Sequence, residues 1–116
     1  MKNQKVLIIG ASRGLGQALA TTFETNGWKV ETLNRDTCDL SDPKSVEKLV
    51  NNSTFINSGF SLCIISAATS EVGFLDELDV KAYRRCMEVN FHSPVTLFSA
   101  LAKSDSPCHR FVFIHS

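Results

Sequence analysis

The stretch Val6–Gly16 reads VLIIGASRGLG and decides the fold that this sequence can adopt. Its apolar start is short enough for a buried strand, which we expect over Lys5–Ile9. The glycines follow at once, where the chain turns into a helix predicted over residues 14–26. Backbone amides in a glycine-rich turn can approach a phosphate group closely, and the positive end of the helix dipole favours the anion. The stretch therefore predicts a strand–loop–helix unit that binds a phosphate-bearing ligand.

Three glycines in this loop meet different steric needs. Gly10 lets the chain turn sharply off the strand, whereas Gly14 and Gly16 leave room where a pyrophosphate and the neighbouring strand approach. The residues between them, Ser12 and Leu15 among them, are expected to line the same ligand site. A glycine-rich turn that binds no ligand is the alternative interpretation.

Strand-like and helix-like segments alternate along the rest of the chain. Such alternation predicts right-handed crossovers between parallel strands, with helices on both faces of the sheet. We therefore expect an α/β fold with a Rossmann-like doubly wound parallel sheet of five strands in the order 3-2-1-4-5. Residues 1–116 would form a single dinucleotide-binding domain that is incomplete at its C-terminal side. The predicted strands are Lys5–Ile9, Trp28–Leu33, Thr37–Leu40, Leu62–Ile65 and Phe111–Ile114; the predicted helices are 14–26, 43–51 and 79–103, and 51–59 is expected to be a loop.

The end of the second predicted strand indicates which dinucleotide is bound. A site for NAD has a carboxylate there, which accepts a hydrogen bond from the ribose 2′-hydroxyl. Here Asn34 and Arg35 occupy the strand end, and Arg13 of the glycine loop can reach the same place. A planar guanidinium suits a phosphate dianion, so we expect NADP(H) rather than NAD(H). Asp36 would reverse this preference if its carboxylate pointed into the site.

Composition argues against several classes of function. Lysine and arginine together number 12, as do aspartate and glutamate, so the zero net charge predicts no binding to nucleic acid or to an anionic membrane. No apolar stretch approaches the length of about 20 residues that spans a bilayer. The 4 cysteines form no metal-binding cluster, and no signal-like segment opens the chain. We therefore expect reduced thiols, no metal and a cytoplasmic location.

With these features in place, the sequence resembles the short-chain dehydrogenase/reductase family over essentially its whole length. The Gly10–Gly16 loop has the spacing of that family. Asp39 and Leu40 match its Asp-hydrophobic pair, which implies that Asp39 accepts a hydrogen bond from the adenine amine and that Leu40 lies beside the ring. Small residues stand where the family has Asn-Asn-Ala and leave room for the cofactor's ribose, namely Ser66, Ala67 and Ala68.

Two further residues match catalytic positions of the family. Asn90, in the long predicted helix, matches its active-site asparagine, and Ser116 falls where its catalytic serine stands. A physical argument supports Asn90, because Pro94 has no N–H to donate to the carbonyl four residues earlier. A freed carbonyl inside a helix needs water or a ligand as its partner, and in the family this group holds a water of a proton relay. A proline-induced bend without chemistry is the alternative.

The family's Tyr-x-x-x-Lys pair has no counterpart here, where the single tyrosine is Tyr83. A placed general acid contributes about 10²–10⁴ in rate, so we expect this chain alone to be inactive. The resemblance implies the NADP(H)-binding portion of an oxidoreductase that acts on a small carbonyl substrate or the corresponding alcohol. A non-catalytic NADP(H)-binding or interaction module, or a truncated remnant without activity, are the alternatives. We also expect self-association, through the long helix 79–103 or the open edge of the fifth strand.

Overall fold

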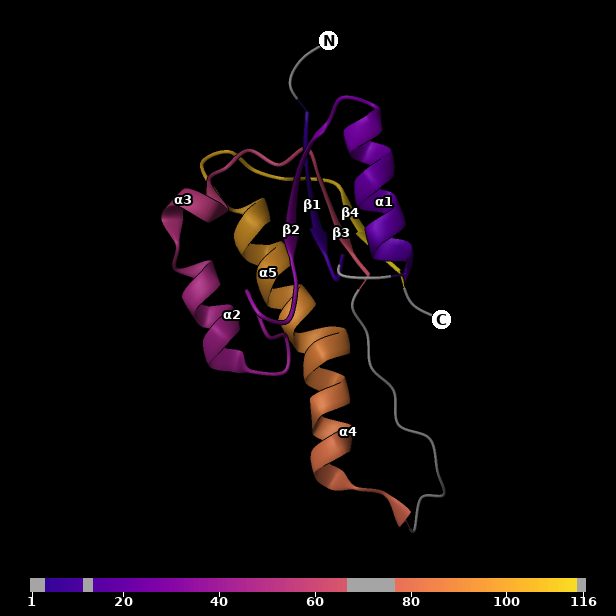
Figure 1. The fold of residues 1–116 in the computed structure, drawn as a ribbon. Coiled ribbons are helices and arrows are strands. Elements are labelled where there is room, and N and C mark those ends of the chain that lie inside the picture. The colour runs from indigo at the N-terminus through magenta and orange to yellow at the C-terminus, as the bar shows by residue number, and fades with distance from the viewer. Residues whose placement is uncertain (1–3, 12–13, 67–76, 115–116) are drawn as a thin grey trace.

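The computed structural model describes residues 4–11, 14–66 and 77–114. Within them the chain forms a parallel four-stranded sheet in the order β2-β1-β3-β4 (Figure 1). The strands are β1 (Lys5–Ile9), β2 (Lys29–Leu33), β3 (Leu62–Ile65) and β4 (Phe111–Phe113). The helical elements are α1 (Gly14–Thr25), α2 (Pro43–Val50), α3 (Ser53–Ile56), α4 (Val80–Met87), the π-helical segment η2 (Glu88–His92) and α5 (Ser93–Ala102).

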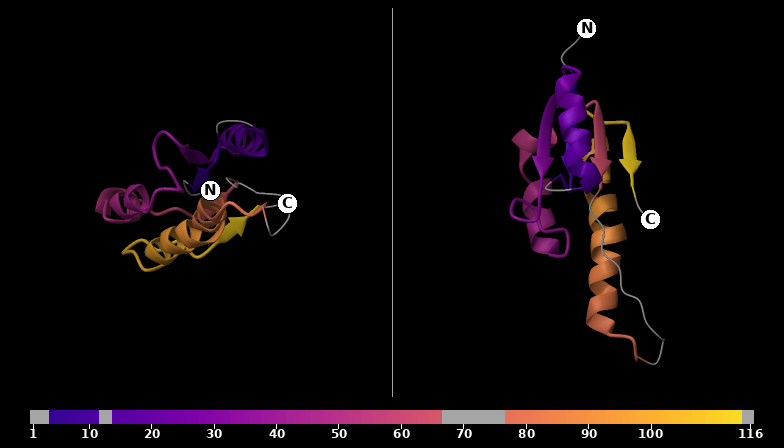
Figure 2. Two further views of the ribbon diagram at one scale, coloured as in Figure 1. Left: turned by 90° about the horizontal axis from the view of Figure 1, so that it is seen from below. Right: turned by 45° about the vertical axis from the view of Figure 1, so that its right-hand side comes forward.

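Strand β1 lies inside the sheet and packs on both of its faces. Val6 and Ile8 belong to the hydrophobic cluster under α1, whereas Leu7 and Ile9 belong to the larger cluster on the side of α2 and α5. This alternation follows from the period of two residues in a strand, and burial on both faces explains the continuous apolar run. Figure 2 shows α1 on one face of the sheet and α2 and α5 on the other. The prediction of helices on both faces is therefore confirmed.

The crossovers explain why the helices divide between the two faces. The chain moves from β1 to β2 through α1, and then passes back over β1 to β3 through α2 and α3. Right-handed crossovers that run in opposite directions place their helices on opposite faces. The direction of winding therefore reverses between β1 and β3, and ligands of open α/β sheets bind at the carboxyl ends of strands at such a point.

The predicted strand Thr37–Leu40 is wrong, because this segment forms turns. The carbonyl of Asn34 accepts hydrogen bonds from the N–H groups of Thr37 and Cys38, at 3.0 and 2.9 Å. The N–H of Asp39 donates to the hydroxyl of Ser45 at 3.1 Å. These local bonds use the donors that a ladder beside β2 would require. The described sheet therefore has four strands, in the order β2-β1-β3-β4, and the predicted order of five strands is corrected accordingly.

Several helix ends follow the expected cap chemistry. Asp42 caps α2 through its side chain, with Pro43 at the first helical position, and Gly27 follows α1 with φ of 84°. The short helix α3 was not predicted, since its segment was expected to be a loop. The side chain of Asn52 caps it by accepting a hydrogen bond from the N–H of Phe55 at 3.2 Å.

The long helix predicted over 79–103 consists of α4, η2 and α5 in succession. The side chain of Asp79 caps its start, as expected. The helix widens into η2 just before Pro94, and the N–H of Ser93 donates to the carbonyl of Glu88, five residues earlier. Pro94 cannot donate, so the hydrogen bonds shift by one residue around it. In Figure 1, α4 projects beyond the carboxyl ends of the strands. Among the described helices, none is both long and apolar enough to cross a bilayer.

Candidate functional site

The carboxyl ends of β1, β2 and β3 bring together predicted site residues that are far apart in the sequence. The N–H of Gly10 donates to the carbonyl of Leu33 at 2.8 Å, at the end of β2. The N–H of Ser66 donates to the carbonyl of Ile9, also at 2.8 Å, at the end of β3. The glycine loop thus leaves the sheet between the strand ends that carry Asn34 and Ser66, at the point where the winding reverses.

The loop folds back tightly onto the first turn of α1. A Cβ atom on Gly16 would lie 2.0 Å from the carbonyl oxygen of Gly10, a distance that no side chain can tolerate. Gly10 itself has φ of 93°, in the left-handed region that favours glycine. The backbone path therefore favours glycine at Gly10 and requires it at Gly16, and this path brings the start of α1 against the end of β1.

The third glycine, Gly14, borders open space. Gly14 has φ of 63°, and a Cβ atom built there would meet nothing within 4 Å. The adjacent Leu15 is 54% exposed although it is apolar. The first turn of α1 therefore presents uncovered backbone at the positive end of the helix, where N–H groups lack helical partners. This geometry fits a phosphate-bearing ligand.

Asn34 holds the glycine loop from the end of β2. Its Oδ1 atom accepts a hydrogen bond from the N–H of Ala11 at 3.0 Å. Its backbone N–H donates to the Thr37 hydroxyl at 2.9 Å, and that hydroxyl donates to the Asn34 carbonyl at 3.0 Å. We predicted Asn34 as a ligand contact, whereas its hydrogen bond to the glycine loop was not predicted. The signal was available, since a short amide side chain beside a glycine loop can satisfy the loop's backbone.

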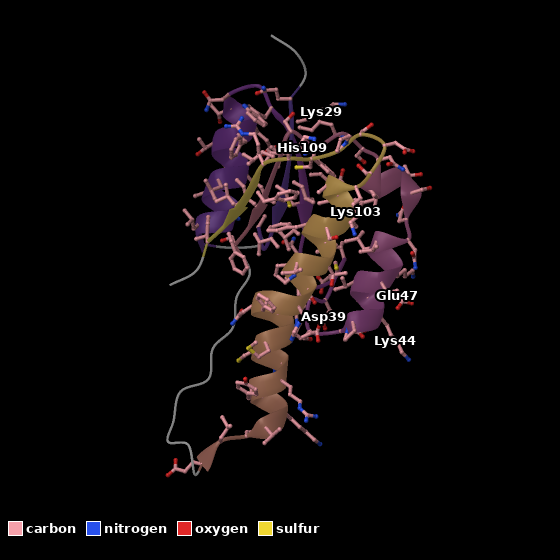
Figure 3. The ribbon with its side chains drawn as sticks, turned by 180° about the vertical axis from the view of Figure 1, so that it is seen from behind. Lys29, Asp39, Lys44, Glu47, Lys103 and His109 are labelled. Atoms are coloured by element: carbon pink, nitrogen blue, oxygen red, sulfur yellow. The ribbon has the colours of Figure 1, made fainter. Side chains whose placement is uncertain are left out.

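Asp39 presents a carboxylate beside the exposed Arg35. Its Oδ1 atom accepts hydrogen bonds from the Ser41 hydroxyl at 2.6 Å and from the Ser41 N–H at 2.9 Å. The Ser41 hydroxyl, then its N–H, and more weakly the Arg35 guanidinium hold the pKa of Asp39 below its ordinary value. Figure 3 shows Asp39 at the border between the long helix and α2. The carboxylate therefore stays an ionised hydrogen-bond acceptor at neutral pH.

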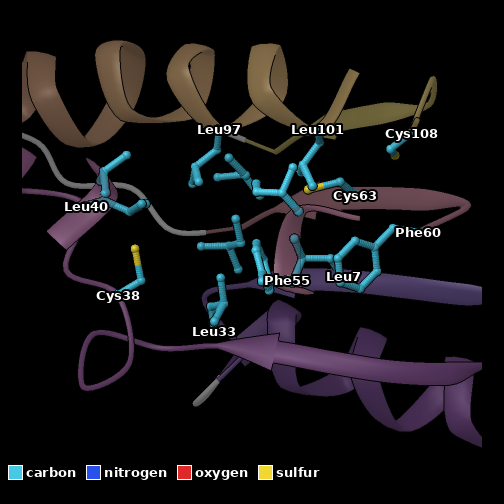
Figure 4. Packing of buried hydrophobic residues seen from close by; sticks show 14 residues of the cluster. Leu7, Leu33, Cys38, Leu40, Phe55, Phe60, Cys63, Leu97, Leu101 and Cys108 are labelled. Carbon is cyan, nitrogen blue, oxygen red and sulfur yellow. The ribbon is translucent and has the colours of Figure 1, made fainter. Parts of the chain in front are cut away.

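Leu40 has a different environment from its neighbour Asp39. Its side chain is 5% exposed and belongs to the cluster that contains Leu97 (Figure 4). Its carbonyl oxygen accepts a hydrogen bond of 2.6 Å from the hydroxyl of Ser93, which was not among the predicted site residues. Of the predicted Asp39–Leu40 pair, only Asp39 has an accessible side chain, so the expected contact of Leu40 with an adenine ring gains no support.

Asn90 lies in η2, the π-helical turn. The sequence predicted that Pro94 leaves the Asn90 carbonyl without its helical donor. In the structure the helix widens at this point, where the N–H of Ser93 donates to the carbonyl of Glu88, and Asn90 has an interaction partner. π-Helical turns are frequent at functional sites, and the position of Asn90 in such a turn is consistent with a site residue. The other predicted site residues lie outside the described residues, namely Ser12, Arg13, Ala67, Ala68 and Ser116.

The thiols offer little chemistry at this site. All 4 cysteines are free, and Cys38, Cys63 and Cys108 are buried. Burial raises the pKa of each of these three thiols, which leaves them protonated and unreactive at neutral pH. Among the described residues, no group of three or more His, Cys, Asp or Glu side chains could hold a metal ion.

A parallel sheet with helices on both faces, and a glycine loop at its switch point, define a nucleotide-binding domain of the Rossmann type. The family model described as RmlD substrate binding domain matches residues 4–106, and the chain belongs to this family. No curated protein matches the chain.

Solved structures of short-chain dehydrogenase/reductases share the fold. One from Brucella ovis is 26% identical with a TM-score of 0.75, and the match covers 88% of this chain and 56% of that one. A second from Brucella ovis, in complex with a partially ordered NAD, is 23% identical with a TM-score of 0.69 and coverage of 89% and 60%. A small-chain dehydrogenase in complex with NADPH is 22% identical with a TM-score of 0.72 and coverage of 88% and 46%. The chain thus spans about half the length of these relatives.

The contact between Gly16 and Gly10 predicts a reversal of the usual effect of alanine. Replacing glycine by alanine inside a helix normally stabilises a protein by about 0.5–1 kcal/mol. Gly16→Ala should instead destabilise this chain by about 1–3 kcal/mol, because the added methyl group displaces the Gly10 carbonyl. Urea unfolding measures the change. Gln17→Ala, at the next and exposed position, serves as the control and should stay within about 0.5 kcal/mol of the parent. Equal or higher stability of Gly16→Ala would contradict the observed path of the loop.

Proposed function

We propose that this chain binds NADP(H) and forms the coenzyme-binding portion of an oxidoreductase that acts on a carbonyl/alcohol pair. The observation that carries the proposal is the glycine loop, which Asn34 clamps through Ala11 while Gly14 leaves its outer side open. Backbone N–H groups at the start of α1 would hold the diphosphate. The relatives whose structures contain NADPH and NAD support a nicotinamide dinucleotide as the ligand.

Arg35 supports NADP(H) over NAD(H). It is exposed at the end of β2, next to the clamp residue Asn34, where a ribose 2′-phosphate would lie. Asn34 uses its amide oxygen for the loop and places no negative charge beside that phosphate. Asp39 would accept a hydrogen bond from the adenine amine, and its lowered pKa keeps it able to do so. Arg13 would add a second guanidinium near the 2′-phosphate.

When bound, the coenzyme would supply hydride transfer to or from a carbonyl carbon. We propose that Asn90 and Ser116 lie on the substrate side of the site, as their match to the family implies. Asn90 would act from η2, where the helix widens next to Pro94. A small carbonyl compound is the proposed substrate class. Because the chain spans about half the length of these relatives, we extend an oxidoreductase activity to it only as a proposal.

Thermal unfolding with NADPH, with NADH and without ligand tests the coenzyme proposal. A ligand at 100 times its dissociation constant should stabilise the chain by about 2.7 kcal/mol, which raises Tm by several degrees in a domain of this size. We expect NADPH to produce this shift and NADH a smaller one. Arg35→Ala should weaken NADPH binding by about tenfold, since one solvent-exposed charge-assisted contact is lost, and should leave the NADH effect unchanged.

Arg110→Ala is the matched control, because Arg110 is also exposed but precedes β4 at the amino edge of the sheet. It should leave both shifts unchanged. Equal shifts with NADPH and NADH in the parent chain would overturn the choice of NADP(H). No shift with either coenzyme would overturn dinucleotide binding itself.

We also propose that the chain self-associates through the long helix. An exposed apolar stripe follows one side of α4, η2 and the start of α5, at spacings of three and four residues. The stripe consists of Val80, Tyr83, Met87, Phe91 and Val95. A contiguous exposed apolar face on a helix that projects from the sheet favours association. The edge strand β4, where Val112 is 42% exposed, offers a second surface.

Sedimentation velocity over a range of chain concentrations tests self-association. We expect a reversible dimer, and Met87→Lys should raise its dissociation constant by about tenfold or more, since an unpaired charge would enter the interface. Gln17→Lys adds the same charge on the exposed side of α1 and should not change the constant. A parent chain that stays monomeric at every concentration would exclude the proposal. If Met87→Lys leaves the dissociation constant of the dimer unchanged, the interface does not lie on the long helix, and β4 becomes the expected interface.

A further inference from the structure

Ser93 is the buried polar residue of the described core, with 1% of its surface exposed. It begins α5 and lies at the head of a buried stripe that continues through Leu97 and Leu101 at intervals of four residues. A hydrophobic side chain would satisfy packing at such a position. Burying a hydroxyl there lowers the stability of the fold unless the hydroxyl makes a hydrogen bond. The hydrogen-bond partner of Ser93 therefore indicates what the residue does.

The partner of Ser93 is a backbone carbonyl of the candidate site. The hydroxyl donates to the carbonyl oxygen of Leu40 at 2.6 Å, across 53 residues of chain. This is short for a hydrogen bond between a hydroxyl and a carbonyl. The Ser93 Oγ atom also lies 3.4 Å from the Oε2 atom of Glu88, whose carbonyl accepts the Ser93 N–H in the π turn. Ser93 therefore connects the widened part of the long helix to the Asp39–Leu40 segment.

The Asp39–Leu40 segment depends on such side-chain bonds because it has no strand ladder. Asp39 is held through its N–H by the Ser45 hydroxyl of α2, and Leu40 is held through its carbonyl by Ser93 of α5. The Asp39 carboxylate accepts its hydrogen bonds from the neighbouring Ser41, which fixes its orientation but not its place in the fold. The place of the carboxylate is thus set from two helices, one on each side.

We propose that Ser93 is a positioning residue for the adenine end of the dinucleotide site. The Ser93–Leu40 hydrogen bond fixes the distance between the Asp39–Leu40 segment and the long helix. The Asp39 carboxylate is thereby placed to accept a hydrogen bond from the exocyclic amine of adenine. This inference rests on the proposed function, since it assumes that the site binds an adenine dinucleotide. It assigns Ser93 no contact with the ligand or with reacting atoms.

Loss of the hydroxyl should affect one end of the ligand more than the other. Without the Ser93 hydroxyl, the buried carbonyl of Leu40 loses this hydrogen-bond donor. The Asp39–Leu40 segment must then shift to give the carbonyl another donor. The diphosphate end is held separately, by the Asn34 clamp on Ala11 and by the contact of Gly16 with Gly10. Discrimination between purines should therefore weaken while the diphosphate contacts persist.

The experiment measures the dissociation constants of NADPH and of its hypoxanthine analogue, in which a carbonyl oxygen replaces the adenine amine. The parent chain should prefer NADPH by about tenfold, the factor that corresponds to one hydrogen bond to a charged group. In Ser93→Ala this ratio should fall by about threefold or more. Asp39→Asn is the positive control and should bring the ratio to about one, because its amide can rotate to serve either purine.

Ile64→Val is the matched control for general loss of stability, since Ile64 is buried on the opposite face, under α1. It should lower Tm to an extent comparable with Ser93→Ala and leave the ratio unchanged. If Ser93→Ala does not fold, Ser93→Cys keeps the shape of the side chain with a somewhat larger and weaker donor, and should give an intermediate ratio. A parent ratio that persists in the Ser93 variant overturns the inference, as does a parent chain that binds both ligands equally. A parent chain that binds neither ligand refutes the proposed function instead.

Discussion

The close approach of α1 to the end of β1 is the constraint on which the rest of the candidate site depends. Because Gly16 has no side chain, the helix can begin against the Gly10 carbonyl, where a Cβ would come within 2.0 Å. This contact directs the unpaired N–H groups of the first helical turn at the space above the switch point between β1 and β3. Asn34 then ties the loop to the end of β2. The path of the backbone, more than any charged side chain, makes the site suited to a diphosphate.

The long helix supplies a second organising feature, because its widened turn joins distant parts of the site. Pro94 removes a donor from the helix, and η2 forms where the hydrogen bonds shift around it. The same turn carries Asn90 and leads into Ser93, whose hydroxyl reaches the Leu40 carbonyl. The proposed substrate side and the proposed adenine side of the site therefore meet at one irregularity of one helix. Its apolar outer stripe gives that helix a further proposed role in self-association.

Local sequence signals predicted most of the fold. The apolar run of β1, the Asp42-Pro43 cap of α2 and the left-handed Gly27 each act through their immediate neighbours, and the structure confirms them. The segment Thr37–Leu40 was wrongly predicted as a strand, because its bonds to Asn34 and Ser45 are specific side-chain and turn contacts that no periodicity encodes. The glycines of the site could also be predicted, because their role depends on the strand and the helix that adjoin them in the sequence.

Tertiary contacts of single side chains were not predictable in the same way. Nothing in the sequence distinguishes Ser93 from other polar residues of a helix, whereas in the structure it is buried and its hydroxyl donates to the Leu40 carbonyl. Asn34 was selected as a site residue, but its clamp on Ala11 depends on how closely the ends of β1 and β2 approach. In both cases the sequence shows the chemical group, whereas the fold decides its partner.

Amide NMR of the chain titrated with NADPH reports on the backbone groups that are proposed to hold the diphosphate. The largest shift changes should occur at Gly14, Leu15 and Gly16, with the amides of α3 unaffected. Saturable binding that leaves those three amides unchanged, or that acts chiefly on α3, would contradict it.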